Sequence, residues 1–412
     1  MPSALQPDRT LLLTLTGHDR PGVTSAVFHA LSPFSVEVLD VEQVVLRGRL
    51  VLGVLVTTPR DDARLRKAIE DVARDLSMDV EVQSGAGDNL PRAHGRSHVT
   101  VLGHPLDPGA VAAIAGRIAD TGGNIDRIIR IARYPVIAIE LDVSGADPLQ
   151  LRSALAIEAA AQQVDVAVQP AGLYRRAKRL VVLDVDSTLI QGEVIEMLAS
   201  RAGCLDEVTR VTAAAMRGEL DFAESLRQRV ALLAGIDARA MDEVRQEIRL
   251  TPGARTLLRT LHRLGYQVGV VSGGFAQIVE PIAAELGIDF VAANLLEVAD
   301  GVLTGRVVGP IVDRPGKAEA LHGFAEQAGV PLSQTVAIGD GANDLDMLAV
   351  AGLGVAFNAK PVVRQAADTA VSVPYLDAIL YLLGITREEI DAADGELGEP
   401  GHDTLDGSGY GG

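Results

Sequence analysis

One stretch, Leu180-Val181-Val182-Leu183-Asp184-Val185-Asp186-Ser187-Thr188, is the starting point from which the architecture of this chain can be predicted. Its first four residues form a continuous apolar run, which is typical of a parallel strand buried on both faces. The strand is followed by two carboxylates, Asp184 and Asp186. Side chains two residues apart on a strand lie on the same face, so we expect these two carboxylates to act as a pair.

Two later apolar segments also end in polar residues. Residues 268–271 lead into Ser272-Gly273-Gly274, and residues 336–338 lead into Gly339-Asp340-Gly341-Ala342-Asn343-Asp344. Parallel strands in an open α/β sheet bind ligands at their carboxyl ends. We therefore expect the polar residues that follow these strands to form one site.

The surrounding pattern predicts an α/β domain over residues 179–385. Strands and helices alternate from Pro252 onward, as expected for a Rossmann-like parallel sheet. Between Thr188 and Thr251 the periodicity is helical and few turn signals occur. We interpret residues 189–251 as a helical cap that could cover the site.

The first 170 residues contain an internal repeat. Each copy begins with a strand and a Gly-containing turn that opens an amphipathic helix, and two strands, a helix and a strand follow. This βαββαβ order predicts two ferredoxin-like domains, 8–84 and 97–169. The candidate ligand-binding residues of the two turns are Gly17, Asp19, Gly103 and Asp107. The glycines either adopt unusual backbone angles in the turns or leave room for a ligand to approach.

Composition excludes several classes of protein. Of the 412 residues, 48% are hydrophobic, enough to build proper cores, while 3% aromatic residues and a net charge of −18 oppose nucleic acid or an anionic membrane as a partner. One cysteine permits no internal disulfide, and no signal peptide or apolar run of about 18 residues is found. We expect a cytoplasmic protein. Residues 386–412 hold eight acids and one arginine and predict a disordered acidic tail.

The ordered strand-end motifs resemble the haloacid dehalogenase superfamily of phosphohydrolases, whose first motif is Asp-x-Asp-x-Thr and whose last is Gly-Asp-x-x-x-Asp. The resemblance covers about residues 179–383. It implies Asp184 as nucleophile and Asp186 as general acid and base. It also implies that the phosphate is bound by Ser272, Gly273 and Lys317. The Mg²⁺ ligands that it implies are Asp184, Asp340 and the backbone carbonyl of Asp186, and Asn343 and Asp344 would support these metal ligands.

Electrostatics agrees with these implied roles. A phosphomonoester dianion repels a carboxylate nucleophile, so attack requires positive charge at the same point. Mg²⁺ supplies such charge and prefers oxygen ligands, while Lys317 adds a point charge and Gly273 an unhindered N–H. A P-loop is excluded, because the Gly spacing in residues 309–317 is too long and Ala318 replaces the required Ser or Thr.

The insertion narrows the expected substrate. Glu193, Met216, Phe222 and residues 224–230 resemble the phosphoserine phosphatase family. The matching residues of that family imply that Glu193 meets the substrate ammonium and Arg229 its carboxylate, with Met216 and Phe222 as an apolar lid. Arg's planar fork suits a carboxylate. The implied reaction is Mg²⁺-dependent hydrolysis of O-phospho-L-serine to L-serine through an aspartyl phosphate.

Both N-terminal repeats are similar to ACT domains. This resemblance implies amino-acid binding at subunit interfaces and a homo-oligomer, a dimer or larger, as the assembly. L-serine is the expected effector because it is the product of the implied reaction; the alternative is that these domains serve only as dimerisation surfaces. Two alternatives stay open for the function of the whole chain. One is a phosphotransferase of the same fold that passes the phosphoryl group to homoserine. The other is an amino-acid sensor whose C-terminal domain is catalytically retired, although the intact Asp184, Asp186, Lys317 and Asp340 speak against it.

Overall fold

The structure is a computed structural model that describes residues 9–59, 61–86, 95–172, 175, 177–216 and 219–396. Contacts divide the chain into two units, Met1–Pro91 and Arg92–Gly412. Within the described residues, none of the helices is long and apolar enough to cross a membrane.

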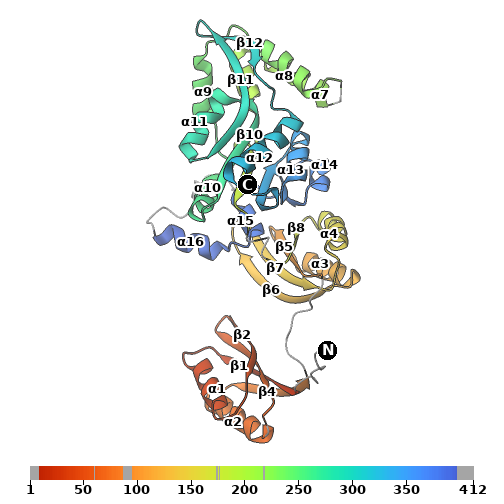
Figure 1. The fold of residues 1–412 in the computed structure, drawn as a ribbon, viewed down its shortest axis with the longest axis vertical. Coiled ribbons are helices and arrows are strands. Elements are labelled where there is room, and N and C mark those ends of the chain that lie inside the picture. Colours follow the sequence, from red (N-terminus) through yellow and green to blue (C-terminus); the bar gives the residue numbers. More distant parts are fainter. Residues whose placement is uncertain are drawn as a thin grey trace, which may run out of the picture. The chain divides into compact units, whose positions relative to one another are not determined.

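The first unit is a four-stranded antiparallel sheet in the order β2-β3-β1-β4 with two helices. Leu11, Leu13 and Leu15 alternate along β1 and face a core shared with both helices. The predicted βαββαβ order is therefore present (Figure 1). Its elements are β1 (Arg9–His18), α1 (Val23–Leu31), β2 (Val38–Leu46), β3 (Arg49–Thr57), α2 (Asp62–Asp75) and β4 (Asp79–Ala86).

The second unit begins with a small domain of the same topology. Its sheet has the order β6-β7-β5-β8, and Val99, Val101, Leu141 and Val143 pack beneath its two helices. Asp107 and Asp147 accept hydrogen bonds from the first backbone N–H groups of these helices. The elements are β5 (Ser97–Gly103), α3 (Pro108–Asp120), β6 (Asn124–Ala132), β7 (Ile137–Ser144), α4 (Pro148–Gln162) and β8 (Asp165–Pro170).

The large domain is built on a seven-stranded sheet in the order β12-β11-β10-β9-β13-β14-β15. All neighbours are parallel except β11 and β12. Chain order reverses at β9, so the carboxyl end of this strand lies at the switch point where open sheets bind ligands. The strands are β9 (Leu180–Asp184), β10 (Gln267–Phe275), β11 (Phe290–Ala299), β12 (Val302–Val308), β13 (Thr335–Gly339), β14 (Gly354–Phe357) and β15 (Thr369–Val371).

Helices cover both faces of this sheet (Figure 1). Leu180 and Val182 of β9 pack toward one set of helices, and Val181 and Leu183 toward the other, which explains the unbroken apolar run. One set is α12 (Arg314–Ala328), α13 (Leu345–Val350) and α14 (Pro361–Ala366); the other includes α10 (Ala254–Arg263), α11 (Ala276–Leu286) and the short α15 (Ile379–Leu382).

The expected insertion is helical. A tight turn at Val185–Leu189 leads from β9 into it, and the chain returns to the sheet before α10. The two connections lie side by side, because Ile190 and Leu250 form an isolated β-bridge and Thr251 N–H donates to the carbonyl of Leu189. The helices are α6 (Val194–Ala202), α7 (Leu205–Met216), α8 (Phe222–Ala231) and α9 (Arg239–Glu247).

The second small domain is joined to the large domain through the face of its sheet opposite its helices. Leu102, Ala138 and Ala167 of this face belong to the same hydrophobic core as Tyr381 and Leu382. Polar groups join the two parts as well: Gln169 Nε2 donates to the Leu382 carbonyl over 2.7 Å, and Ser372 N–H donates to Asp165 Oδ2 over 2.6 Å.

The prediction of a disordered tail from residue 386 is wrong for its first part. Arg387–Glu396 forms helix α16, in which Ile390 and Asp394 are buried. Asp394 pairs with two arginines of α10, Arg259 at 2.6 Å and Arg263 at 2.5 Å, so part of the acidity is neutralised by a partner distant in sequence. Residues 397–412 of the predicted tail lie outside the described residues.

Candidate active site

The three strand ends singled out in the sequence meet at one edge of the large sheet. β9 lies between β10 and β13, and Asp184 pairs in register with Val271, the residue before Ser272. Asp340 directly follows the last residue of β13. The sheet itself thus brings the predicted motifs together.

Lys317 links two carboxylates beneath this edge. It extends from the first turn of α12, and its Nζ lies 2.7 Å from Asp184 Oδ1 and 2.7 Å from Asp344 Oδ1. Lys317 and Asp344 are fully buried, and Asp184 is 3% exposed. Burial acts to lower the pKa of Lys317, but the two carboxylates outweigh it and hold that pKa above its ordinary range. Lys317 is therefore a fixed positive charge.

Carboxylate oxygens of Asp184, Asp340 and Asp344 lie within 4.8 Å of one another. Burial, reinforced by the charge of Asp344, raises the pKa of Asp184 well above its usual range and that of Asp340 to about 6. One lysine does not balance three carboxylates, so the group favours an added cation. An all-oxygen set fits Mg²⁺, and Thr188 Oγ1 orients Asp340 by donating to its Oδ1 over 3.2 Å.

Asp344 is more central than the sequence indicated. It was expected to support the metal, yet it belongs to the carboxylate group itself and also accepts the Gly341 N–H over 2.9 Å. Asn343, beside it on the same short helical turn, is partly buried. The side chain of Asp186 lies outside the carboxylate group, so only its backbone carbonyl remains as the predicted ligand.

Asp186 is positioned by a different backbone element from the one expected. The spacing predicted that both residues lie on one strand, but the strand ends at Asp184 and Asp186 lies in the tight turn that follows. Its carboxylate accepts hydrogen bonds from Val194 N–H over 2.8 Å and from Ser272 Oγ over 3.1 Å. Burial raises the pKa of Asp186 despite these hydrogen bonds and the charge of Lys317. A protonated form of Asp186 is thereby favoured.

The irregular carboxyl end of β10 places small groups against Asp186. Ser272 is fully buried, and its Oγ accepts the Gly274 N–H over 2.8 Å. A Cβ on Gly273 would lie 3.0 Å from the ring of Phe222, and one on Gly274 would lie 3.0 Å from Asp186 Oδ2. A side chain at either position would therefore require its neighbour to shift. The closeness of Phe222 also shows that the cap reaches this end of β10.

The predicted cap residues face the same region. Glu193 keeps contact with solvent, and Ser187 Oγ donates to its Oε1 over 3.3 Å. Desolvation and the charges of Asp186 and Asp340 raise the pKa of Glu193 to about 7. Burial lowers the pKa of Arg229, opposed by the nearby charges of Glu193 and Asp186.

Arg229 is partly buried, whereas Arg227 is exposed and lies 3.9 Å from Glu224. As the spacing of two residues on a helix requires, the arginines point to different sides. The side chain of Met216 lies outside the described residues.

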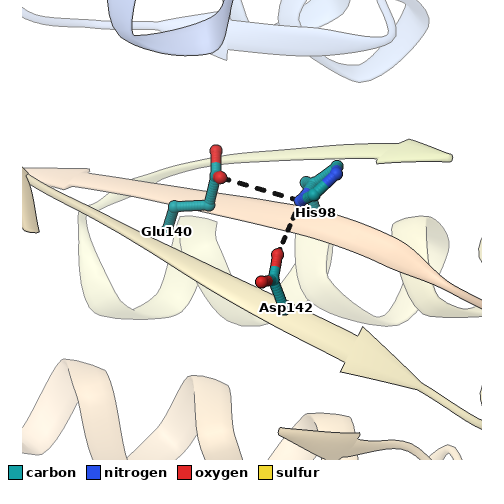
Figure 2. Close-up of side chains that lie close together, drawn as sticks. All are labelled: His98, Glu140 and Asp142. Carbon is teal, nitrogen blue, oxygen red and sulfur yellow. Dashed lines mark hydrogen bonds and ion pairs between the residues drawn. The ribbon is translucent and has the colours of Figure 1, made fainter. Parts of the chain in front are cut away.

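Figure 2 shows a second group of side chains of the types that bind metals. His98 Nδ1 lies 2.7 Å from Asp142 Oδ1 and 3.6 Å from Glu140 Oε1. These residues lie on β5 and β7, away from the strand ends of the large sheet. Glu140 also pairs with the buried Arg175, whose Nε donates to the Leu382 carbonyl over 3.4 Å. We assign this group to the junction between the second small domain and the large domain.

The glycines of the two N-terminal repeats have a packing role. Neither Gly17 nor Gly103 has a positive φ, so the expectation of unusual backbone angles is wrong. A Cβ on Gly17 would lie 2.6 Å from Met78, and one on Gly103 would lie 3.1 Å from Leu106. The domains' own side chains therefore occupy the Cβ direction of each glycine.

The two aspartates of these turns differ. Asp107 caps α3 by accepting the Gly109 N–H over 2.6 Å, a local role that needs no ligand. Asp19 is exposed, and its N–H donates to the Gly48 carbonyl over 2.8 Å.

One buried polar residue of this region escaped the sequence reasoning. Asn294 is fully buried near the end of the parallel part of β11, and its side chain donates a hydrogen bond to the irregular end of β10. A signal was available, because Asn294 follows the short segment 290–293 in the same way that Ser272 follows 268–271.

Comparison with known families agrees with this architecture. Residues 181–349 match the haloacid dehalogenase-like hydrolases, and residues 9–83 and 96–169 each match ACT domains.

Individual relatives extend over nearly the whole chain. A phosphoserine phosphatase of Streptomyces coelicolor is 65% identical over 387 residues, covering 93% of this chain and 94% of the relative. One of Mycobacterium tuberculosis is 57% identical over 394 residues, covering 93% and 95%. Among solved structures, a probable phosphoserine phosphatase from Vibrio cholerae is 33% identical, with a TM-score of 0.56 over 72% of this chain and 88% of the other.

Proposed function

The chain belongs to the phosphoserine phosphatase family, and we propose that it hydrolyses O-phospho-L-serine with Asp184 as the nucleophile. The observation that carries this assignment of roles is the ion pair of 2.7 Å between Asp184 and Lys317 beside two further carboxylates. It supports a carboxylate that is oriented at the carboxyl end of the central strand beside a fixed positive charge.

The first half of the reaction transfers the phosphoryl group to the enzyme. Asp184 attacks phosphorus, a bond forms between its carboxylate oxygen and phosphorus, and the bond to the serine oxygen breaks. Asp186 gives its proton to the departing serine alkoxide. The raised pKa of Asp186 supports this role, because the protonated form must be available at the start.

The second half releases phosphate. Asp186, now ionised, takes a proton from water, which attacks the phosphorus of the aspartyl phosphate and frees inorganic phosphate from Asp184. Ser272 Oγ, the backbone of Gly273 and the Lys317 ammonium hold the phosphoryl oxygens.

The enzyme depends on Mg²⁺, which Asp184, Asp340 and the backbone carbonyl of Asp186 would hold, with Asp344 and Asn343 in support. When bound, Mg²⁺ neutralises negative charge on the phosphoryl group.

Substrate choice rests on the cap. Glu193 binds the substrate ammonium and Arg229 its carboxylate, while Phe222 and Met216 close over them and exclude water. The closeness of Phe222 to Gly273 supports a cap that closes over the segment proposed to bind phosphate, Ser272 and Gly273. None of the described contacts favours transfer to homoserine, and the complete carboxylate set opposes a retired catalytic domain.

Regulation and assembly belong to the same proposal. The two ACT domains bind an amino acid, for which the product L-serine is the effector we propose, and they join copies of the chain into a homo-oligomer in the cytoplasm. We propose that the effector binds near the turns that contain Gly17, Asp19, Gly103 and Asp107, where the domains' own packing occupies only the Cβ direction of each glycine.

The decisive test is phosphate release from O-phospho-L-serine with Mg²⁺, with EDTA, and with added homoserine. We expect Mg²⁺-dependent release at an unchanged rate when homoserine is present, and no phosphohomoserine. Formation of phosphohomoserine would establish the transferase instead, and absence of turnover with Mg²⁺ would overturn the proposal.

A further inference from the structure

Asn294 joins two segments of the chain that the sheet does not hold together. Its Nδ2 donates to the Gly273 carbonyl over 2.9 Å, and its Oδ1 accepts the Val312 N–H over 2.8 Å. The residue is fully buried. Both backbone groups would lose a hydrogen-bond partner if this side chain were removed, which is costly inside a protein.

The first of these segments is the irregular end of β10, which carries Ser272 and Gly273. Pairing between β10 and β11 is regular through Ser272 and resumes only at Phe275, opposite Asn294. Gly273 thus lies in the irregular part of the strand. The Asn294 amide takes the Gly273 carbonyl there and so fixes the peptide that carries the next N–H group of the loop.

The second segment leads into the helix that carries Lys317. Val312 precedes Asp313, which caps α12 by accepting the Gly316 N–H over 2.9 Å. The Lys317 N–H in turn donates to the Asp313 carbonyl over 2.9 Å. A hydrogen bond to Val312 therefore fixes the start of the helix, one turn before Lys317.

We infer that Asn294 is a positioning residue for catalysis, which holds the Ser272–Gly273 loop and the start of the Lys317 helix at a fixed separation. The inference rests on the proposed function, in which these two elements bind the same phosphoryl group. Asparagine suits this place because its planar amide offers a donor and an acceptor side by side. Ionised aspartate keeps the acceptor for Val312 but cannot donate to Gly273.

The chain offers a matched control. Gln277 also spans to β11 with its amide, donating to the Leu296 carbonyl over 2.7 Å and accepting the Leu296 N–H over 3.3 Å. It holds neither the Gly273 carbonyl nor Val312. Gln277→Ala therefore removes a comparable pair of hydrogen bonds without releasing either phosphate-binding element.

The experiment compares Asn294→Ala, Asn294→Asp and Gln277→Ala with the wild type in the full chain, below the Tm of each. The measurements are kcat and KM for O-phospho-L-serine and for p-nitrophenyl phosphate, and inhibition by inorganic phosphate. Displacing a catalytic group by about 1 Å lowers the rate on the order of 10²-fold. We therefore expect Asn294→Ala to lower kcat/KM by about 10- to 100-fold, about equally for both esters, and to weaken inhibition by phosphate. Asn294→Asp should lose a similar factor in kcat/KM, and Gln277→Ala should keep kcat within about twofold.

Two results would overturn the inference. One is a folded Asn294→Asp enzyme whose kcat and phosphate inhibition match the wild type. The other is a loss that follows Tm alone, equal in the Asn294 and Gln277 variants. A wild type that fails to hydrolyse O-phospho-L-serine but binds phosphate more tightly than Asn294→Asp would refute the proposed function and leave the positioning role intact.

Discussion

Lys317 Nζ lies 2.7 Å from the carboxylate of Asp184, and the same ammonium lies 2.7 Å from Asp344. Lys317 and Asp344 are fully buried, so neither charge of that pair is screened by water. Lys317 therefore has two roles. It stabilises the buried carboxylates in the resting fold, and it lies beside the oxygen that we propose as nucleophile.

Replacement of this ammonium should be seen in stability as well as in activity. Lys317→Met leaves Asp184 and Asp344 buried without their counter-charge, and we expect a loss of about 3–5 kcal/mol in the free energy of unfolding. Thermal unfolding with and without Mg²⁺ measures it. Mg²⁺ should restore part of the loss, because it supplies positive charge to the same carboxylates. A Tm equal to that of the wild type under both conditions would contradict the role of Lys317.

The two catalytic aspartates should fail differently. Asp184→Asn cannot form an aspartyl phosphate, so we expect no turnover and no labelled enzyme after brief incubation with ³²P-phosphoserine. Asp186→Asn keeps the nucleophile but loses proton transfer, so kcat should fall about 10²- to 10⁴-fold. Rapid-quench and steady-state assays of the two variants distinguish these results. Wild-type turnover by Asp184→Asn would end the assignment of the nucleophile.

Glu193 should make substrate recognition depend on pH. Its pKa is raised to about 7, so the carboxylate that attracts the substrate ammonium is present above this pH and is lost as the pH falls through it. We expect kcat/KM for phosphoserine, divided by that for p-nitrophenyl phosphate, to fall about tenfold from about pH 8 to about pH 6. Glu193→Gln is the control, and its ratio should stay flat. A falling ratio in that variant would assign the titration to another group.

Arg229 and Arg227 of α8 allow recognition of the substrate carboxylate to be distinguished from a general effect of surface charge. Arg229→Ala removes the proposed contact to the substrate carboxylate, which costs roughly 1.5–3 kcal/mol, or about 10- to 150-fold in kcat/KM. The loss should be specific for phosphoserine and small for p-nitrophenyl phosphate. Arg227→Ala removes an exposed arginine from the same helix and should change neither. Equal losses on both substrates in Arg229→Ala would indicate a structural role.

Strand-end chemistry is the part of this protein that sequence predicts well. Asp184, Ser272 and Asp340 each follow an apolar run, and parallel strands bring such positions to one edge wherever the sheet order permits. What could not be predicted depends on contacts between distant segments. The spacing of Asp184 and Asp186 pointed to a shared strand, but the strand ends at Asp184 and Asp186 lies in the turn that follows.

Two further differences have the same physical origin. The charge of residues 387–396 suggested disorder, because sequence does not show that Asp394 meets Arg259 and Arg263. The repeat in the first 170 residues revealed two domains of one topology, but not that the outer face of the second sheet shares a core with Tyr381 and Leu382. Burial of that face depends on a neighbour about 200 residues away along the chain.

This shared core leads to a prediction about regulation. A chain starting at residue 95 keeps every described contact of the second unit, so it should fold and hydrolyse phosphoserine at the wild-type rate. A chain starting at residue 177 exposes the core around Tyr381 and loses the Gln169 and Asp165 hydrogen bonds, so its Tm should fall or it should aggregate. L-serine inhibition and sedimentation of both, beside the full chain, locate the effector site. If the chain starting at residue 95 is no longer inhibited by L-serine, serine binding is assigned to the first ACT domain. Undiminished inhibition of that chain excludes the first ACT domain as the effector site. A stable, fully active chain from residue 177 would contradict the structural role of the second domain.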